Sequence, residues 1–214
     1  MSLSGKVALV TGGGKNLGAD TARQLAKEGA TLAIHYNSAK SKAETEAFVA
    51  ALQKDGTKAS IHVGDLTSAA AAEKLFSEVT QQHGKVDIMV STVGMALKKP
   101  IVEISKAEYD VMFAVNSKAA FFLLKEAAKH IQEGGKIVTV VTALLGAFTG
   151  FYTSYAGSKA PVEHFTRGVA KELADKKISV NCIAPGPMDT PFFYPQETPE
   201  AVAFHKTQAR ARAW

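Results

Sequence analysis

Short apolar runs alternate along this chain with longer segments whose apolar residues recur at helical spacing. The runs that predict strands are Lys6–Val10, Thr31–Tyr36, Ala59–Val63, Val86–Val90, Lys136–Val141 and Ser179–Ile183. Strands that are apolar at nearly every position are typical of a parallel sheet covered by helices on both faces. The alternation therefore predicts one α/β domain over residues 1–214, a Rossmann-like, doubly wound sheet that binds ligands beyond the carboxyl ends of its strands.

Helical spacing predicts helices in the segments between these strands. Two segments begin with the pattern of a capping box, Ser41 with Glu44 and Ser105 with Glu108. The helical segments that bear on function are Leu17–Glu28, Tyr109–Ile131 and Tyr155–Asp175.

A glycine-rich turn, Thr11-Gly-Gly-Gly-Lys-Asn-Leu-Gly18, lies between the first predicted strand and the first predicted helix. This context favours a dinucleotide fingerprint, because backbone N–H groups and the helix N-terminus then face the phosphates. A tight strand-to-helix connection without a ligand is the alternative interpretation.

Tyr155 and Lys159 lie one helical turn apart and so share a helix face. A phenol titrates near pH ~10, and a neighbouring ammonium favours the phenolate, which would make Tyr155 a better acid-base catalyst. The spacing alone is weak, since a tyrosine packed over a lysine stem is common on helices.

Taken in order, the motifs resemble those of the short-chain dehydrogenase/reductase family, and more narrowly those of 3-oxoacyl-carrier-protein reductases. They extend over roughly residues 5–191 and comprise Thr11-Gly12…Asn16-Leu17-Gly18, Ser91–Gly94, Asn116, Thr142, Tyr155 with Lys159, and Pro185-Gly186. Three of them depart from the family pattern. Asn16 replaces a glycine but tolerates left-handed backbone angles, Ser91-Thr92-Val93 replaces Asn-Asn-Ala, and Thr142 replaces the usual serine while keeping a hydroxyl.

The resemblance implies a role for each matching residue. Tyr155 donates a proton to a carbonyl oxygen, Lys159 lowers the pKa of Tyr155 and binds the nicotinamide ribose, and Thr142 hydrogen-bonds the substrate oxygen. Asn116 orients a water that relays protons towards Lys159; its alternative is a polar residue that merely breaks a helix. The expected cofactor-binding residues are Gly12, Lys15, Asn16, Leu17, Gly18, Asn37, Ser38, Asp65, Leu66, Gly94, Tyr155, Lys159, Pro185, Gly186, Met188 and Thr190. Asp65 would bind the adenine amino group, and an ordinary turn aspartate is the equal alternative.

The segment after the second strand predicts the choice of cofactor. An acidic residue there would bind the ribose hydroxyls of NAD, but the chain has Asn37 and Ser38, followed by Lys40 and Lys42. With Lys15 in the glycine turn, a 2′-phosphate would meet donors and cations. We therefore expect NADP(H) to be favoured over NAD(H), although these lysines also fit a solvated loop.

Charge and composition argue against several other classes of protein. The net charge is +5, but the lysines are spread along the chain, which disfavours nucleic-acid binding. The single cysteine, Cys182, excludes an internal disulfide, and no zinc constellation is present, so no metal site is expected. With no apolar run long enough to span a membrane and no signal region, we expect a cytoplasmic protein without membrane partners. The resemblance implies a homodimer or homotetramer.

Aromatic residues gather near the expected substrate site and favour an apolar or aromatic ketone; core or interface packing is nearly as good an explanation. They are Phe148, Phe151, Tyr152, Phe192, Phe193 and Tyr194, with Met95 and Leu145 beside them. The Tyr155–Lys159 spacing argues against an enoyl reductase, and a nucleotide-sugar epimerase would need a larger C-terminal domain. Family members continue into another helix and a seventh strand, so a truncation or a frameshift is expected to account for the end at Trp214. A cofactor-binding or interaction protein with weak or lost activity is thus the second hypothesis.

Overall fold

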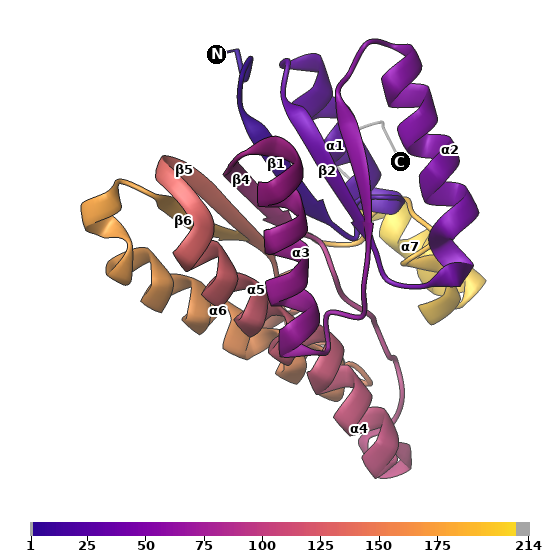
Figure 1. The fold of residues 1–214 in the computed structure, drawn as a ribbon. Coiled ribbons are helices and arrows are strands. Elements are labelled where there is room, and N and C mark those ends of the chain that lie inside the picture. The colour runs from indigo at the N-terminus through magenta and orange to yellow at the C-terminus, as the bar shows by residue number, and fades with distance from the viewer. Residues whose placement is uncertain (1, 209–214) are drawn as a thin grey trace.

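The computed structural model describes residues 2–208, which form a six-stranded parallel sheet with helices on both faces (Figure 1). The strand order is β3-β2-β1-β4-β5-β6, so the chain reverses direction across the sheet between β1 and β4. The strands are β1 (Val7–Thr11), β2 (Thr31–Tyr36), β3 (Ala59–Val63), β4 (Val86–Ser91), β5 (Ile131–Val140) and β6 (Ser179–Ile183). This is the predicted doubly wound, Rossmann-like fold.

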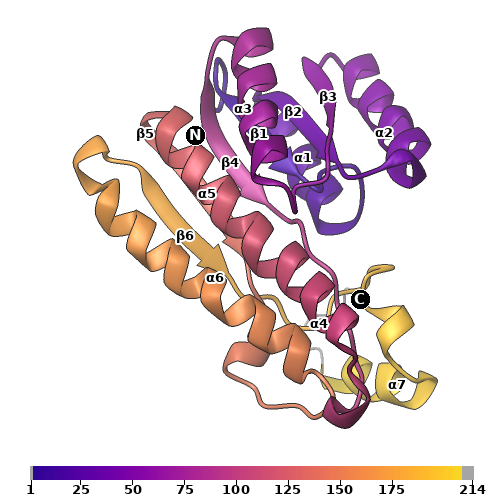
Figure 2. The same ribbon diagram turned by 60° about the horizontal axis from the view of Figure 1, so that its bottom comes forward.

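Seven α-helices connect or flank the strands within residues 2–208. They are α1 (Asn16–Lys27), α2 (Lys42–Lys54), α3 (Ala69–His83), α4 (Lys106–Phe113), α5 (Ala119–His130), α6 (Thr153–Glu172) and α7 (Pro199–Gln208). Helices α5 and α6 lie side by side along the sheet, whereas α4 and α7 lie beyond its end (Figure 2).

Two apolar clusters cover the two faces of the sheet, and β1 contributes to both. Val7 and Leu9 pack with α3 and α5, whereas Ala8 and Val10 pack with α1 and α2. Successive side chains of a strand point to opposite faces, so an entirely apolar strand is required where helices cover both. Strand β3 lies at the edge and alternates buried and exposed residues instead.

Strands β2, β3 and β6 have the predicted bounds, β1 is shifted by one residue at both ends, and β4 extends one residue further. Strand β5 begins at Ile131, five residues before the prediction, and its pairing with β4 shifts register between Val86 and Ile88. Gly134 and Gly135 precede the predicted start of this strand at Lys136. Here they sit within the strand, and Gly134 adopts a positive φ of 74°.

The helix predicted over Tyr109–Ile131 is divided into α4, a π-helical turn at Ala114–Lys118, and α5. A turn of this kind inserts one extra residue per turn and is common at functional sites. The Ser105 capping box forms as predicted, but the one at Ser41 does not. Ser41 ends a short 3-10 turn, so its backbone lacks the extended conformation of an N-cap and its side chain makes no cap bond.

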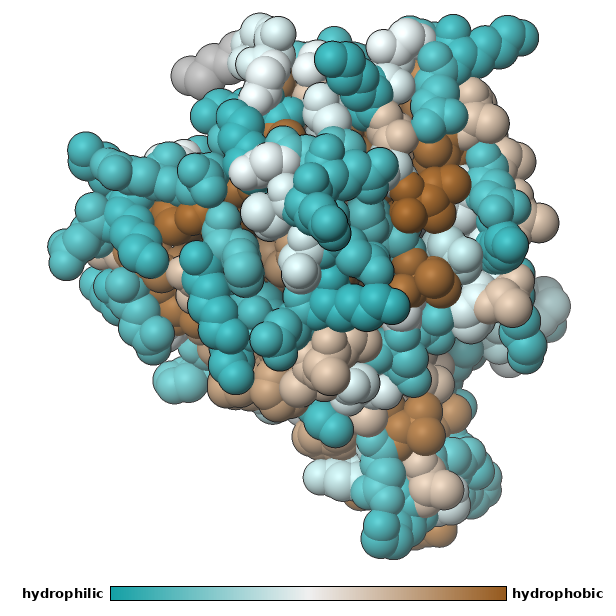
Figure 3. Space-filling model, viewed as in Figure 1, coloured by the Kyte–Doolittle hydropathy of each residue, from teal (hydrophilic) through white to brown (hydrophobic). Residues whose placement is uncertain are grey.

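The face seen in Figure 1 is mainly polar, with small, separated apolar patches (Figure 3). None of the helices in residues 2–208 is long and apolar enough to span a membrane. The predicted C-terminal shortening involves residues 209–214, which lie outside the described part of the chain.

Candidate active site

A cleft of about 790 Å³ lies beyond the carboxyl ends of the strands. All the site residues that the sequence predicted line it, with the exception of Asn116. Each of the six strands is followed by some of them, at its carboxyl end or at the start of the next helix, and Tyr155 and Lys159 come from α6. They are Gly12, Lys15, Asn16, Leu17, Gly18, Asn37, Ser38, Asp65, Leu66, Gly94, Thr142, Tyr155, Lys159, Pro185, Gly186, Met188 and Thr190. The topology thus brings together residues that lie up to 178 positions apart in the chain, from Gly12 to Thr190.

The glycine turn folds back tightly on itself and on the segment after β4. Gly12 has a φ of 70°, which favours glycine, and a Cβ atom on Gly18 would lie 2.3 Å from the carbonyl oxygen of Gly12. The Thr92 hydroxyl donates to the carbonyl oxygen of Thr11 at 2.8 Å. The glycines are therefore required by close backbone approach within this turn.

Asn16, which replaces the expected glycine, has a φ of 49°. This confirms that asparagine supplies the left-handed angle that the turn needs. Helix α1 begins at Asn16, and the first bond of its ladder runs from the Ala19 N–H to the Lys15 carbonyl oxygen at 3.1 Å. The N–H groups of residues 16–18 precede that bond, so this helix N-terminus suits an anion.

Polar and basic residues follow β2 and form the next part of the cleft wall. They are Asn37, Ser38, Lys40 and Ser41, with no carboxylate among the lining residues 36–41. Asp65, after β3, accepts hydrogen bonds from the backbone N–H and hydroxyl of Thr67 at 3.0 and 2.9 Å. Asp65 is thus both a turn aspartate and a lining residue, and Leu66 lines the cleft while it also packs in the core.

Tyr155 and Lys159 lie on α6, and both are buried. The Lys159 Nζ donates to the carbonyl oxygens of Val140 at 2.9 Å and Val93 at 3.4 Å. Burial lowers the pKa of Lys159 to about 8. The ammonium is therefore held between the ends of β4 and β5.

Burial raises the pKa of Tyr155, and a hydrogen bond with Thr142 lowers it in part. The expectation that Lys159 brings this pKa below its ordinary value is not met in this structure, because desolvation of the phenol is the larger effect. Thr142 lies at the end of β5, where its Oγ1 also accepts a hydrogen bond from the Leu144 N–H at 3.3 Å. Two hydroxyl groups, from Tyr155 and Thr142, thus meet in a largely desolvated part of the cleft.

Asn116 lies within the π-helical turn and is fully buried beneath the cleft. Its Oδ1 accepts from the Met95 N–H and its Nδ2 donates to the Met95 carbonyl oxygen, both at 2.9 Å. The Nδ2 also lies 2.9 Å from the Ser158 Oγ, which donates to the carbonyl oxygen of Tyr155. Asn116 is therefore more than a helix-breaking residue: its side chain joins the loop after β4 to the Tyr155 turn of α6.

Only some of the aromatic residues expected near the substrate line the cleft. Tyr152, Phe192 and Phe193 do so, together with Met95. The prediction is wrong for Phe148 and Phe151, which are exposed, and for Leu145, which packs against Val141 and Val162. Tyr194 is also absent from the lining, because its hydroxyl turns to Asp189 at 2.5 Å.

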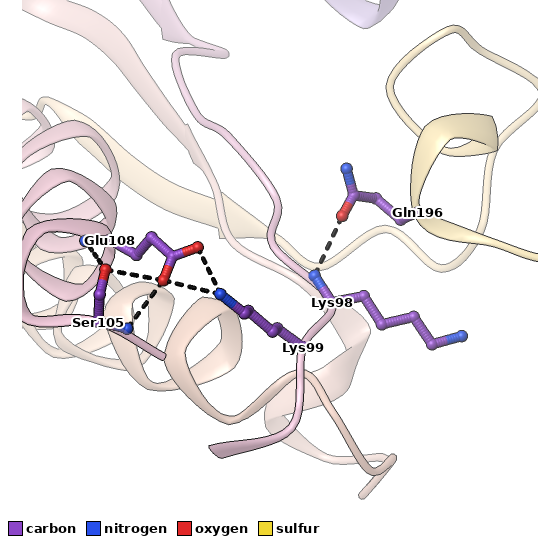
Figure 4. A network of polar contacts seen from close by, with 5 residues as sticks. All are labelled: Lys98, Lys99, Ser105, Glu108 and Gln196. Carbon is purple, nitrogen blue, oxygen red and sulfur yellow. Dashed lines mark hydrogen bonds and ion pairs between the residues drawn. The ribbon is translucent and has the colours of Figure 1, made fainter. Parts of the chain in front are cut away.

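The loop after β4 holds the C-terminal segment in place, through residues that the sequence did not single out. The Lys98 N–H donates to the Gln196 Oε1 at 3.0 Å, and Lys99 binds the Glu108 carboxylate of the α4 capping box (Figure 4). The Lys98 Nζ also lies 2.5 Å from Oε2 of Glu197, a buried carboxylate that lines the cleft. No local sequence pattern predicts contacts between charged or polar loop residues that lie so far apart in the chain.

The chemistry of the cleft fits a nicotinamide dinucleotide. Its glycine turn and helix N-terminus suit a pyrophosphate. At the other end, a Cβ on Gly94 would lie 2.9 Å from the Lys159 Nζ, so glycine leaves room for the ammonium group in its present position. Apolar side chains from Val93 and Met188 line the cleft between these ends.

Residues 6–201 match the model of the short chain dehydrogenase family. A hydroxynaphthalene reductase-like protein, Arp2, of Metarhizium anisopliae is 41% identical over 194 residues, which are 90% of this chain and 72% of that protein. Elsinochrome reductase 1 of Elsinoe fawcettii is 36% identical over 90% of this chain and 72% of that protein.

Solved structures are similar over most of the chain. A Burkholderia cenocepacia structure described as a dehydrogenase with bound NADP is 58% identical, with a TM-score of 0.94, and the match covers 98% of this chain and 79% of that one. A blue fluorescent protein from a metagenomic library, in complex with NADPH, is 34% identical with a TM-score of 0.86, and the match covers 90% and 78% of the two chains.

The chain belongs to the short chain dehydrogenase family. It is an NAD(P)-dependent oxidoreductase of that family, as its motifs predicted.

Proposed function

We propose that the protein reduces an apolar or aromatic ketone with NADPH, and that Tyr155 is the proton donor. The observation that carries this proposal is the meeting of Tyr155, Thr142 and Lys159 at the end of a cleft whose other end suits a dinucleotide. The bound cofactor would supply the hydride. The chain's own residues position the carbonyl group and provide the proton.

The proton-transfer roles follow from the electrostatics of the site. The raised pKa of Tyr155 keeps the phenol protonated at neutral pH, which is the form that reduction requires. The Thr142 hydroxyl is placed to donate to a substrate oxygen as negative charge develops on it. The Lys159 ammonium adds a positive charge beneath the same part of the cleft, and Asn116 fixes the turn that carries Tyr155.

Cofactor preference is supported by the residues after β2. Asn37 and Ser38 offer hydrogen-bond donors, and Lys40 and Lys15 offer positive charge, where an NAD-specific site would have a carboxylate. The NADP and NADPH in two similar solved structures agree with this preference. NADPH is therefore the cofactor that we propose.

The proposed substrate class rests on the walls of the cleft and on the relatives. Met95, Tyr152, Phe192 and Phe193 provide an apolar and aromatic surface, and the relatives include proteins named as reductases of hydroxynaphthalene and elsinochrome. An aryl ketone fits this surface better than a charged or sugar substrate. The narrower likeness to 3-oxoacyl-carrier-protein reductases, the cytoplasmic location and the homo-oligomer stay predictions.

The test is NADPH oxidation by the purified protein with paired ketones of similar size, one aryl and one aliphatic, and with a charged keto acid as a third substrate. We expect the aryl ketone to have the lowest KM of the three substrates, and the reaction to be faster with NADPH than with NADH. Tight NADPH binding without turnover of any ketone would instead support the cofactor-binding hypothesis. Equal use of the keto acid would contradict the proposed substrate class.

A further inference from the structure

His35 connects the two loops that flank the adenosine end of the cleft. It lies on β2 between Thr11 of β1 and His62 of β3, and its side chain is 1% exposed. Its ring Nδ1 accepts the Gly12 N–H at 3.3 Å, and its Nε2 lies 2.8 Å from the Gly64 carbonyl oxygen. One buried imidazole thus binds the glycine turn on one side and the segment before Asp65 on the other.

These two contacts fix the proton on the ring. The Gly64 carbonyl oxygen can only accept, so Nε2 must carry the hydrogen; the Gly12 N–H can only donate, so Nδ1 must be bare. Both bonds therefore require the neutral imidazole. Burial lowers the pKa of His35 to about 4, with a smaller contribution from the nearby His62. The Gly64 carbonyl and Asp65 raise the pKa, but their effect is smaller than that of burial. The neutral imidazole therefore prevails at physiological pH.

The backbone of His35 strengthens the same link. Its carbonyl oxygen accepts the Gly13 N–H at 3.0 Å, so two consecutive amides of the glycine turn bind one residue of β2. These two amides are directed away from a ligand. The pyrophosphate is left to the amides that follow, in residues 16–18 at the start of α1.

We propose that His35 is a positioning residue of the cofactor site, which holds the pyrophosphate turn and the adenine loop at a fixed separation. It would act on the pyrophosphate and adenine parts of the cofactor, which NADPH and NADH share. Without it, the cofactor would have to order both loops on binding, and this ordering cost would weaken affinity.

The test measures the Kd of NADPH and of NADH by fluorescence titration, together with kcat at saturating cofactor. His35→Leu removes both side-chain links. His35→Asn keeps an acceptor near Nδ1, and His35→Gln keeps a donor near Nε2, so each retains one link. For each lost hydrogen bond we expect about a fivefold rise in Kd, with His35→Leu the weakest binder and kcat unchanged.

The comparison between the cofactors separates this role from phosphate recognition. Both Kd values should rise by the same factor in His35 variants, whereas Ser38→Asp, a matched control in the same segment, should weaken NADPH selectively. Folding is checked by circular dichroism, and if His35→Leu does not fold, the two single-link variants carry the test. Folded variants with wild-type Kd for both cofactors, or with an effect on NADPH alone, would overturn the proposal.

Discussion

The Tyr152 hydroxyl donates a 2.5 Å hydrogen bond to Oε1 of Glu197, 45 residues further along the chain. Burial would raise the pKa of Glu197, but the bonds from Lys98 and Tyr152 hold it below its usual range, so the carboxylate is charged at neutral pH. The Tyr152 ring in turn lies with its centroid 6.0 Å from that of Tyr155. One carboxylate therefore joins the C-terminal segment to the ring beside the proposed proton donor.

Breaking this pair should weaken substrate binding more than cofactor binding. Glu197→Gln removes the charge that Lys98 and Tyr152 share, and Tyr152→Phe removes the donor alone. Because hydrogen bonds to charged groups contribute more than neutral ones, we expect the KM for the best ketone to rise about tenfold in Glu197→Gln and less in Tyr152→Phe. The Kd of NADPH should not change.

Asp110→Asn is the matched control, because Asp110 forms an exposed ion pair with Lys106, also at 2.5 Å. An exposed pair contributes little, so this variant should behave as wild type. A ketone KM in Glu197→Gln equal to that of Asp110→Asn would show that the contact does not shape the substrate site.

Tyr155→Phe removes the proposed proton donor and leaves the ring in the apolar cluster with Met112 and Tyr152. We expect kcat to fall by about 10² to 10⁴, the usual contribution of a positioned acid, with NADPH affinity and folding retained. Tyr109→Phe, at an exposed tyrosine on α4, controls for the loss of a hydroxyl elsewhere. Near-normal turnover by Tyr155→Phe in a pre-steady-state assay would remove Tyr155 from the mechanism.

The sequence predicted the strands and the lining of the cleft well because both depend on local patterns. An apolar run such as Thr31–Tyr36 indicates a buried strand by its composition alone. In a parallel sheet the segments that follow the strands then lie at the same edge. The sequence could not predict partners that only the folded chain creates. Asn116 contacts Met95 because a π-helical turn positions its side chain, and Glu197 pairs with Lys98, which lies 99 residues earlier in the chain. No local sequence pattern predicts either contact. His35 had one signal, a polar side chain near the end of an otherwise apolar strand.

Placing a carboxylate after β2 should change cofactor preference. Asn37→Asp and Ser38→Asp would each set a negative charge beside the proposed 2′-phosphate position, where like charges repel. Ser38 precedes the 3-10 turn Ala39–Ser41 with an extended backbone, so aspartate is tolerated there as an N-cap. We expect the KM for NADPH to rise about tenfold or more and that for NADH to change little.

Asn181→Asp, at an exposed position on β6, makes the same change in net charge far from this segment and serves as the control. Steady-state KM values for both cofactors, measured in parallel for the three variants, decide the matter. Equal changes for NADPH and NADH in Asn37→Asp and Ser38→Asp would mean that these residues do not contact the phosphate.

Three histidines should make the protein sensitive to mild acid. Burial lowers the pKa values of His35, His62 and His83, so the unfolded chain binds more protons than the folded one below pH ~6.5. Their contribution to stability is therefore complete above that pH and is lost as the pH falls towards the folded pKa values. For His35 the shift from 6.5 to about 4 corresponds to a loss on the order of 3 kcal/mol at the acid limit.

The proton arrangement around Ser60 gives this prediction a specific variant. The His62 Nδ1 faces the Glu78 carboxylate at 3.3 Å and so carries a hydrogen, which leaves its Nε2 to accept from the Ser60 hydroxyl at 2.8 Å. The Ser60 oxygen then accepts from His83 Nε2 at 2.7 Å. Protonation of His62 would set a second donor against Ser60 and break this chain of hydrogen bonds.

We therefore expect the free energy of unfolding, measured by urea denaturation without cofactor, to fall between pH 7 and pH 5. His62→Asn, which cannot titrate, should be less stable at pH 7 but should show a smaller fall. His164→Asn, at an exposed histidine of α6, should keep the wild-type slope. The carboxylates whose pKa values are lowered, such as Asp87, titrate at lower pH and do not contribute to this range. A pH slope in His62→Asn as steep as that of wild type would contradict the assignment.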